Sequence, residues 1–172
     1  MNRHFFNFTV FLVLLVFCGM GCGSAKEQEA DPFSKAPNLQ LSDLNGTLYS
    51  LSEYKDKQQP VILFFWTTWC PYCRQELRVL KDKYEELLTD GWELFAVNVG
   101  ESASKVDSFI KNASLPFKVL LDKTASVTKS FGVFGVPTYV VIGKDGLIRA
   151  MEHYFPEDTI KELIVSLREP PL

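Results

Sequence analysis

The chain has 172 residues, of which 47% are hydrophobic and 23% are charged, and its formal net charge is −3. This globular balance, without any block of basic residues, excludes nucleic acid and anionic lipid surfaces from the expected partners. About 150 residues remain after an N-terminal targeting segment, which suits one domain with a full hydrophobic core.

Residues 1–22 have the pattern of a signal peptide. The apolar run from Phe5 to Phe17 spans 13 residues, which is typical of a signal-peptide core and too short for a comfortable membrane span. Small residues precede Cys22, as in a bacterial lipoprotein signal, although the usual leucine three positions earlier is Gly19 here. We expect lipid attachment at Cys22, with an ordinary signal peptide or an uncleaved anchor as alternatives. Each of the three would export the domain.

The polar segment 23–37 predicts a flexible tether, because its composition cannot bury a core. The globular domain is therefore expected over residues 38–168. It should open with a β-hairpin whose arms, 39–44 and 47–50, flank a two-residue turn at Asn45-Gly46.

Strand and helix patterns then alternate. Continuous apolar runs indicate buried strands, and apolar residues at helical spacing indicate helices. The expected elements are strand 61–66, helix 72–88, strand 92–99, a helix capped by Ser102 or Ser104 that runs to 111, strand 117–121, helix 124–131, the hairpin 138–142 and 147–153, and a last helix that starts near Pro156 and ends before Pro170. This order predicts a three-layer α/β domain with a central mixed sheet.

The motif that carries chemistry is Trp69-Cys70-Pro71-Tyr72-Cys73, where a buried strand ends and a helix begins. Its spacing lets both sulfurs meet across the first helical turn. Cys70 then faces the helix N-terminus, whose unpaired N–H groups and dipole stabilise a thiolate. We expect Cys70 to attack a substrate disulfide and the less exposed Cys73 to resolve the mixed disulfide. The redox-active pair Cys70–Cys73 needs no further cofactor.

Two other interpretations fit an isolated Cys-x-x-Cys pair. A zinc site would need two more Cys or His ligands, whereas the mature chain offers only His153 once Cys22 carries lipid. A structural disulfide would stabilise little, because it would close so short a loop.

A second signal is Val136-Pro137, which stands immediately before an expected strand. Proline cannot donate to a sheet ladder, and a cis bond would leave the Val136 backbone able to pair with an extended substrate segment. A strand-entry proline is the alternative for this pair alone, but the upstream cysteine motif favours the functional interpretation. The residues expected to contact substrate are Trp69, Pro71, Tyr72, Val136 and Pro137.

Together these motifs resemble the thioredoxin superfamily, and most closely its TlpA/ResA branch of membrane-tethered extracytoplasmic thiol–disulfide oxidoreductases. The resemblance covers residues 37–168, with 101–122 similar to the strand–helix insertion of that branch. It implies protein thiol or disulfide substrates, apocytochrome c among them, a membrane thiol–disulfide electron donor, and a monomer held outside a bacterial membrane. The matching segments are APNLQLSDLNGTLYSLSEYKDK, VILFFWTTWCPYCRQEL, GWELFAVNVGES, LPFKVLLDKT and FGVFGVPTYVVIGKDGLI.

Two departures from plain thioredoxin bear on the chemistry. The buried aspartate that lies six residues before the first cysteine is replaced by Phe64, which cannot relay a proton. The branch often has a glutamate three residues after the second cysteine, and Glu76 stands there, on the same helix face as Cys73. We expect Glu76 to accept or return the proton of the resolving step, with an exposed helix glutamate as the alternative. The Pro71-Tyr72 pair, familiar from glutaredoxins, leaves the direction of electron flow open.

Two rival functions match parts of the pattern. A peroxiredoxin-like thiol peroxidase would use Thr67, three residues before Cys70, but its proline and arginine are replaced by Leu63 and Pro137. A copper-binding thioredoxin-fold metallochaperone would need His153 beside the cysteines, which copper carriers of this fold usually space by three residues.

Overall fold

The computed structural model describes residues 34–168. The predicted signal peptide, Cys22 and most of the predicted tether lie outside these residues. The end of that tether is held in the domain, because the Ala36 N–H donates to the Gly146 carbonyl at 3.0 Å and the Ile148 N–H donates to the Ser34 carbonyl at 2.9 Å. No helix within the described part of the chain is long and apolar enough to cross a membrane.

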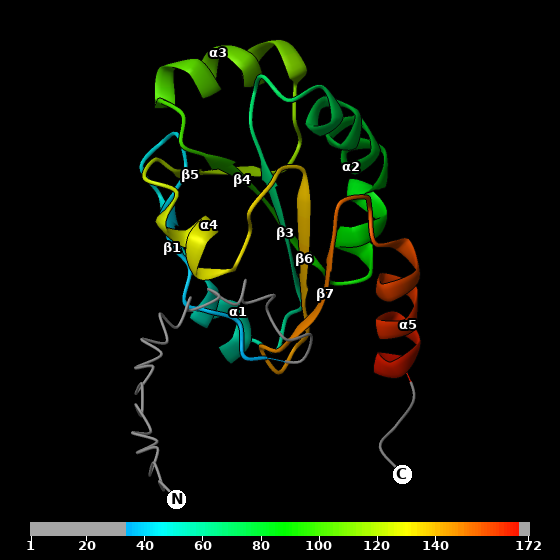
Figure 1. Ribbon diagram of the computed structural model, residues 1–172. Coiled ribbons are helices and arrows are strands. Elements are labelled where there is room, and N and C mark those ends of the chain that lie inside the picture. The colour runs from blue at the N-terminus through cyan, green and yellow to red at the C-terminus, as the bar shows by residue number, and fades with distance from the viewer. Residues whose placement is uncertain (1–33, 169–172) are drawn as a thin grey trace, which may run out of the picture.

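The centre of the domain is a mixed five-stranded sheet in the order β5-β4-β3-β6-β7 (Figure 1). β3 pairs in parallel with β4 and antiparallel with β6, while β5 is parallel to β4 and β7 antiparallel to β6. Every residue of the central strand β3 is buried, as the apolar run predicts. The strands are β3 (Val61–Trp66), β4 (Glu93–Val99), β5 (Lys118–Asp122), β6 (Thr138–Ile142) and β7 (Ile148–Glu152).

Helices cover both faces of this sheet, which confirms the predicted three-layer thioredoxin-like fold (Figure 1). Because side chains alternate along a strand, Phe64 and Trp66 of β3 join one apolar cluster, whereas Leu63 and Phe65 join the other. The first cluster includes side chains of α2 (Pro71–Thr89), α3 (Ala103–Ala113) and α5 (Glu157–Arg168). The second includes side chains of α1 (Leu51–Asp56) and α4 (Ser126–Ser130).

The N-terminal hairpin is present, but its turn differs from the expected one. β1 (Gln40–Ser42) pairs antiparallel with β2 (Leu48–Ser50), and residues 43–47 join them. The Asp43 carboxylate accepts hydrogen bonds from the N–H groups of Asn45 and Thr47, both at 2.9 Å. This side chain organises a wider loop than the two-residue turn that Asn45-Gly46 predicts.

Helix α1 is the one described element that the sequence analysis does not anticipate. It follows β2 directly, and its buried residues are Leu51 and Tyr54. A pair at this spacing over six residues gives too short a pattern to establish a helical period. The other elements lie within about two residues of their predicted bounds, which is ordinary uncertainty for helix and strand ends.

Candidate active site

The sulfur of Cys70 caps helix α2. Cys70 is the N-cap residue and has extended backbone angles, and Pro71 occupies the first turn, where its missing N–H is not needed. The Cys73 N–H donates to Cys70 Sγ at 3.2 Å. The sulfur thus takes the place of the usual capping oxygen, at the helix end where a negative charge is stabilised.

The sulfur of Cys73 lies deeper than that of Cys70. Both cysteines are free thiols, and Cys70 is 4% exposed while Cys73 is 0% exposed. Burial, followed by the hydrogen bond with Cys70, raises the pKa of the Cys73 thiol to about 12. Cys73 therefore stays protonated near neutral pH, and it must lose a proton before it can attack another sulfur.

The loop before β6 brings Val136 against the first cysteine. The Val136–Pro137 peptide bond is cis, as predicted, and Cys70 Sγ donates to the Val136 carbonyl at 3.7 Å. Two side chains hold this loop: Thr138 Oγ1 donates to the Gly135 carbonyl at 2.8 Å, and His153 Nδ1 donates to the Pro137 carbonyl at 2.8 Å. The fold thus brings the Val136-Pro137 motif and the cysteine motif together, as expected from the sequence.

Glu76 is a half-buried residue on the helix that carries Cys73. Its Oε2 accepts hydrogen bonds from the Tyr139 hydroxyl at 2.9 Å and from the Phe155 N–H at 3.1 Å. The Tyr139 ring packs against Phe64, with 4.6 Å between the ring centroids. Burial, and then the charge of Glu76, raises the pKa of Tyr139 far above its ordinary value, so Tyr139 remains a hydrogen-bond donor at all ordinary pH values.

Three large aromatic side chains, two in the cysteine motif and one in the loop before β6, are open to solvent. Trp69 is 63% exposed, Tyr72 is 65% exposed and Phe134 is 76% exposed. Trp69 and Tyr72 belong to the predicted substrate contacts, and Pro71 between Cys70 and Tyr72 is also exposed. Phe134 is new, and its only sequence signal is an apolar residue next to a glycine in the loop before Pro137.

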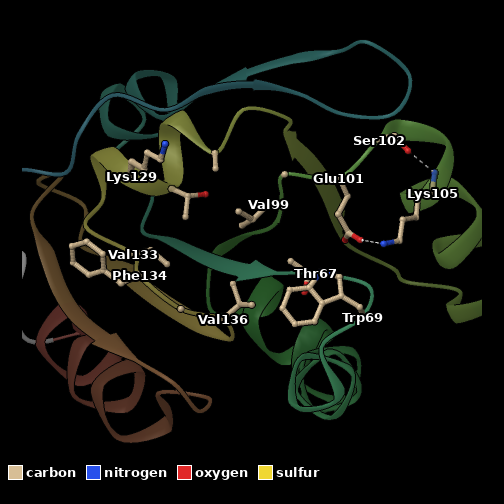
Figure 2. A pocket seen from close by; sticks show the side chains of 14 residues that line it. Thr67, Trp69, Val99, Glu101, Ser102, Lys105, Lys129, Val133, Phe134 and Val136 are labelled. Atoms are coloured by element: carbon tan, nitrogen blue, oxygen red, sulfur yellow. Dashed lines mark hydrogen bonds and ion pairs between the residues drawn. The ribbon is translucent and has the colours of Figure 1, made fainter.

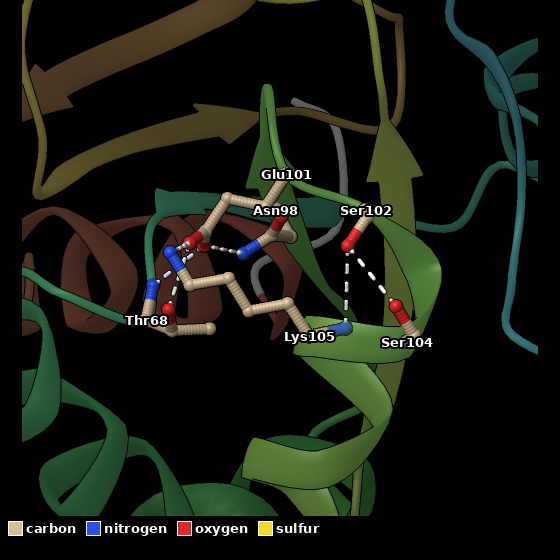
Figure 3. Close-up of polar contacts among 6 residues, drawn as sticks. All are labelled: Thr68, Asn98, Glu101, Ser102, Ser104 and Lys105. Carbon is tan, nitrogen blue, oxygen red and sulfur yellow. Dashed lines mark hydrogen bonds and ion pairs between the residues drawn. The ribbon is translucent and has the colours of Figure 1, made fainter.

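A buried carboxylate holds the loop that precedes Cys70 (Figure 3). Glu101, just after β4, accepts hydrogen bonds from the backbone N–H and the hydroxyl of Thr68, each at 2.7 Å. It also accepts a hydrogen bond from Asn98 Nδ2 at 2.8 Å and pairs with Lys105 Nζ at 2.7 Å. Because Thr68 lies two positions before Cys70, these contacts fix the path of the chain into the cysteine motif.

The same contacts keep Glu101 ionised. Burial alone would raise the pKa of Glu101, but the hydrogen bonds from Lys105, Asn98 and Thr68 outweigh it and lower the pKa to about 2. No local motif in the sequence gives Glu101 a role. A glutamate directly after a buried strand is the signal that could have identified it.

A hollow of about 660 Å³ opens between the Cys70 loop and helix α4 (Figure 2). Trp69, Glu101 and Lys105 lie along one side, and Lys129 and Phe134 lie along the other. Val136, whose carbonyl contacts Cys70 Sγ, also lines the hollow. The first cysteine therefore lies at the edge of an open surface large enough for a short peptide segment.

Similarity to known proteins agrees with this geometry. A model of the AhpC/TSA family matches residues 32–151. The thiol-disulfide oxidoreductase ResA of Bacillus subtilis is 34% identical over 142 residues, covering 80% of this chain and 78% of that protein. The chain belongs to the AhpC/TSA family. Within this family it is a thiol–disulfide oxidoreductase of the ResA type, a likeness that covers four fifths of its length.

Solved structures support the same assignment. StoA from Bacillus subtilis matches with a TM-score of 0.63 at 26% identity, covering 74% of this chain and 96% of that one. A Chlorobium tepidum protein described as a DsbE thiol:disulfide interchange protein matches with a TM-score of 0.69 at 25% identity, covering 79% of this chain and 96% of that one.

A copper site would need a third ligand beside the two cysteines, and His153 is the candidate that the sequence offers. Over residues 34–168, no three His, Cys, Asp or Glu side chains gather closely enough to hold a metal ion. The nitrogen His153 Nδ1 is engaged by the Pro137 carbonyl. His153 therefore contacts the loop before β6 through this nitrogen.

The Glu101 cluster gives a first testable prediction. Glu101→Gln should lower the free energy of unfolding at pH 7 by about 1–3 kcal/mol, because it weakens several charge-assisted hydrogen bonds in a buried place. The pKa of Glu101 is lowered in the folded state, so the carboxylate stabilises the fold above its ordinary pKa of 4.5 and loses this effect as the pH falls toward about 2.

Urea unfolding curves of the parent and the variant, recorded from pH 7 down to pH 3, measure this difference. The gap in unfolding free energy should narrow below about pH 4.5. Glu162→Gln, on an exposed position of α5, is the matched control and should change little. A gap that stays constant with pH would contradict the assigned charge state of Glu101.

Proposed function

We propose that this protein exchanges disulfides with protein substrates through Cys70 and Cys73, with no further cofactor. The observation that carries this proposal is the hydrogen bond from the Cys73 N–H to Cys70 Sγ at the N-terminus of α2. This position stabilises a thiolate on Cys70, while burial keeps Cys73 protonated. The two sulfurs are therefore prepared for different steps.

In the first step, the Cys70 thiolate attacks one sulfur of a substrate disulfide. The substrate S–S bond breaks, a mixed disulfide forms with Cys70, and the second substrate sulfur leaves as a thiolate. Cys73 then loses its proton and attacks Cys70 Sγ, which releases the first substrate sulfur and leaves a Cys70–Cys73 disulfide. Two electrons pass from the protein to its substrate, and the reverse sequence oxidises a substrate dithiol.

Glu76 is the group we assign to the proton of the second step. Burial raises the pKa of the Cys73 thiol to about 12, so a nearby proton acceptor would speed the loss of its proton. Glu76 lies one helical turn beyond Cys73, and Tyr139 and the Phe155 N–H hold its Oε2 in place. Both contacts are to Oε2, so the other carboxylate oxygen is left to accept a proton.

The place of action in this proposal is the outer side of a bacterial membrane. Residues 1–22 would export the domain, and lipid on Cys22 would anchor it as a monomer. A membrane thiol–disulfide donor would then return the Cys70–Cys73 disulfide to the dithiol. Apocytochrome c is one client class for such a protein, and the sequence motifs of these first residues are the support for the location.

The order of attack predicts different outcomes for the two cysteine variants. Cys70→Ser should abolish the reduction of insulin disulfides, whereas Cys73→Ser should accumulate long-lived mixed disulfides because the resolving thiol is missing. Insulin turbidity and mass spectrometry under non-reducing conditions measure these outcomes. Alkylation of the parent at mildly acidic pH should label Cys70 first, and preferential labelling of Cys73 would reverse the two roles.

A peroxide-consumption assay on the parent tests the peroxidase alternative, and we expect no peroxide turnover.

Anchoring can be tested at the lipid site. The parent should sediment with membranes, and Cys22→Ala should release the protein because its covalent lipid is lost. Cell fractionation and immunoblotting measure the distribution. If the variant stays as firmly bound as the parent, residues 1–22 act as an uncleaved anchor instead.

The proton-transfer role predicts that Glu76→Gln slows the resolving step by about a hundredfold or more, within the range of general base catalysis. The domain should stay folded, because glutamine can still accept the hydrogen bonds from Tyr139 and Phe155. Rapid mixing of the dithiol protein with a disulfide substrate, followed by acid quenching, measures decay of the mixed disulfide.

In Glu76→Gln this decay should accelerate steeply with increasing pH, because hydroxide must then remove the Cys73 proton. Glu85→Gln, an exposed position on the same helix, is the matched control and should behave like the parent. Equal decay rates and equal pH profiles in all three proteins would assign Glu76 to a structural role only.

A further inference from the structure

The hollow beside Cys70 has an electrostatic preference. We propose that it binds an extended segment of the substrate protein that carries an acidic side chain close to its reactive cysteine. This inference rests on the proposed function, and it adds the chemical class of substrate sequence that the site selects.

Access to Cys70 requires the substrate chain to lie against the surrounding surface. Cys70 is only 4% exposed, and its neighbours Trp69 and Val136 line the adjoining hollow, so the residues that flank a substrate disulfide would lie in that hollow. That hollow runs from the Cys70 loop to α4 and the loop before Pro137, and it is open along its length (Figure 2). An extended polypeptide fits such an open surface better than a compact small molecule, which is usually enclosed.

The walls of the hollow offer apolar contact at both sides. Trp69 and Phe134 stand opposite each other (Figure 2) and are 63% and 76% exposed. Solvent-exposed large aromatic side chains are typical of binding surfaces, because their burial by a partner stabilises the complex. An apolar residue of the substrate segment would fill the space between them.

The charge of the hollow is positive, on a protein whose formal net charge is −3. Its charged lining consists of Glu101, Lys105 and Lys129. Glu101 is already engaged by four donors, including Lys105 Nζ at 2.7 Å, so these two charges offset each other. The charge of Lys129 is left without a compensating carboxylate among the described lining residues, and a carboxylate on the substrate would complement it.

The position of Lys129 makes this preference selective. The residue is exposed on α4 and lies on the same side of the hollow as Phe134, across from Trp69 (Figure 2). Lys129 lines the same hollow as Val136, whose carbonyl contacts Cys70 Sγ, so a carboxylate there would belong to the segment that flanks the reactive cysteine. Lys129 would repel a lysine or arginine at the same place. The site would therefore favour acidic substrate segments and disfavour basic ones.

A peptide series tests this inference directly. Three short peptides share a phenylalanine and one cysteine, and they differ only in aspartate, asparagine or lysine on both sides of that pair. Each cysteine is joined by a disulfide to the chromophoric thiol thionitrobenzoate. When Cys70 attacks the peptide sulfur, the S–S bond breaks and coloured thionitrobenzoate leaves, so its absorbance gives the rate constant for attack.

The parent should react roughly three- to fivefold faster with the aspartate peptide than with the lysine peptide, as expected for a partly exposed ion pair. Lys129→Glu should reverse this order. Lys123→Glu, an exposed lysine just before α4 that does not line the hollow, should keep the parent's order. High salt should reduce the parent's preference, and Phe134→Ala should slow all three peptides.

Three results would overturn the inference. Equal rates for the three peptides with the parent would remove the charge preference. A preference that survives in Lys129→Glu, or that changes equally in Lys123→Glu, would move it away from the hollow. Failure of the proposed function has a different signature, because the parent would then release no more chromophore from any peptide than Cys70→Ser does.

Discussion

The hydrogen bond between the Cys73 N–H and Cys70 Sγ is the interaction on which the site depends. It forms because β3 ends and α2 begins within a few residues, so that a sulfur occupies the capping position of a long helix. The central strand β3 is buried along its whole length and paired on both sides. The sheet therefore fixes where the helix starts and where the first sulfur lies.

Two carboxylates contact the chain around this cap, and they differ in the number of their hydrogen-bond donors. Glu101 accepts from four donors in a buried place, which keeps it ionised and makes it a fixed anchor for the loop before Cys70. Glu76 accepts from two donors at a single oxygen and stands on the helix that carries Cys73. The difference leaves one oxygen of Glu76 open to a further partner, which is the feature that the proposed proton transfer requires.

Much of the fold follows from local patterns. The buried run of β3, the helical spacing in α2 and the proline before β6 each predict their element, because side-chain period and proline chemistry act over a few residues. Local patterns fail where one side chain decides the outcome. Asp43 binds two N–H groups and widens the first hairpin turn, and helix α1 is too short for its period to be recognised.

The sequence by itself determined the cysteine pair, its place at a strand–helix junction, and the proline that faces it. Only the tertiary structure decided how the remaining side chains serve the pair. Glu76 meets Tyr139 and Phe155 across 63 and 79 positions of the chain, and Glu101 meets Thr68 across 33. Contacts of this kind depend on how the sheet brings distant loops to one edge, and no local period encodes them. The same reason applies to Phe134 and Lys129, which line one side of the hollow. Neither residue stands out in the sequence, because the hollow exists only when the fold brings the Cys70 loop to its other side.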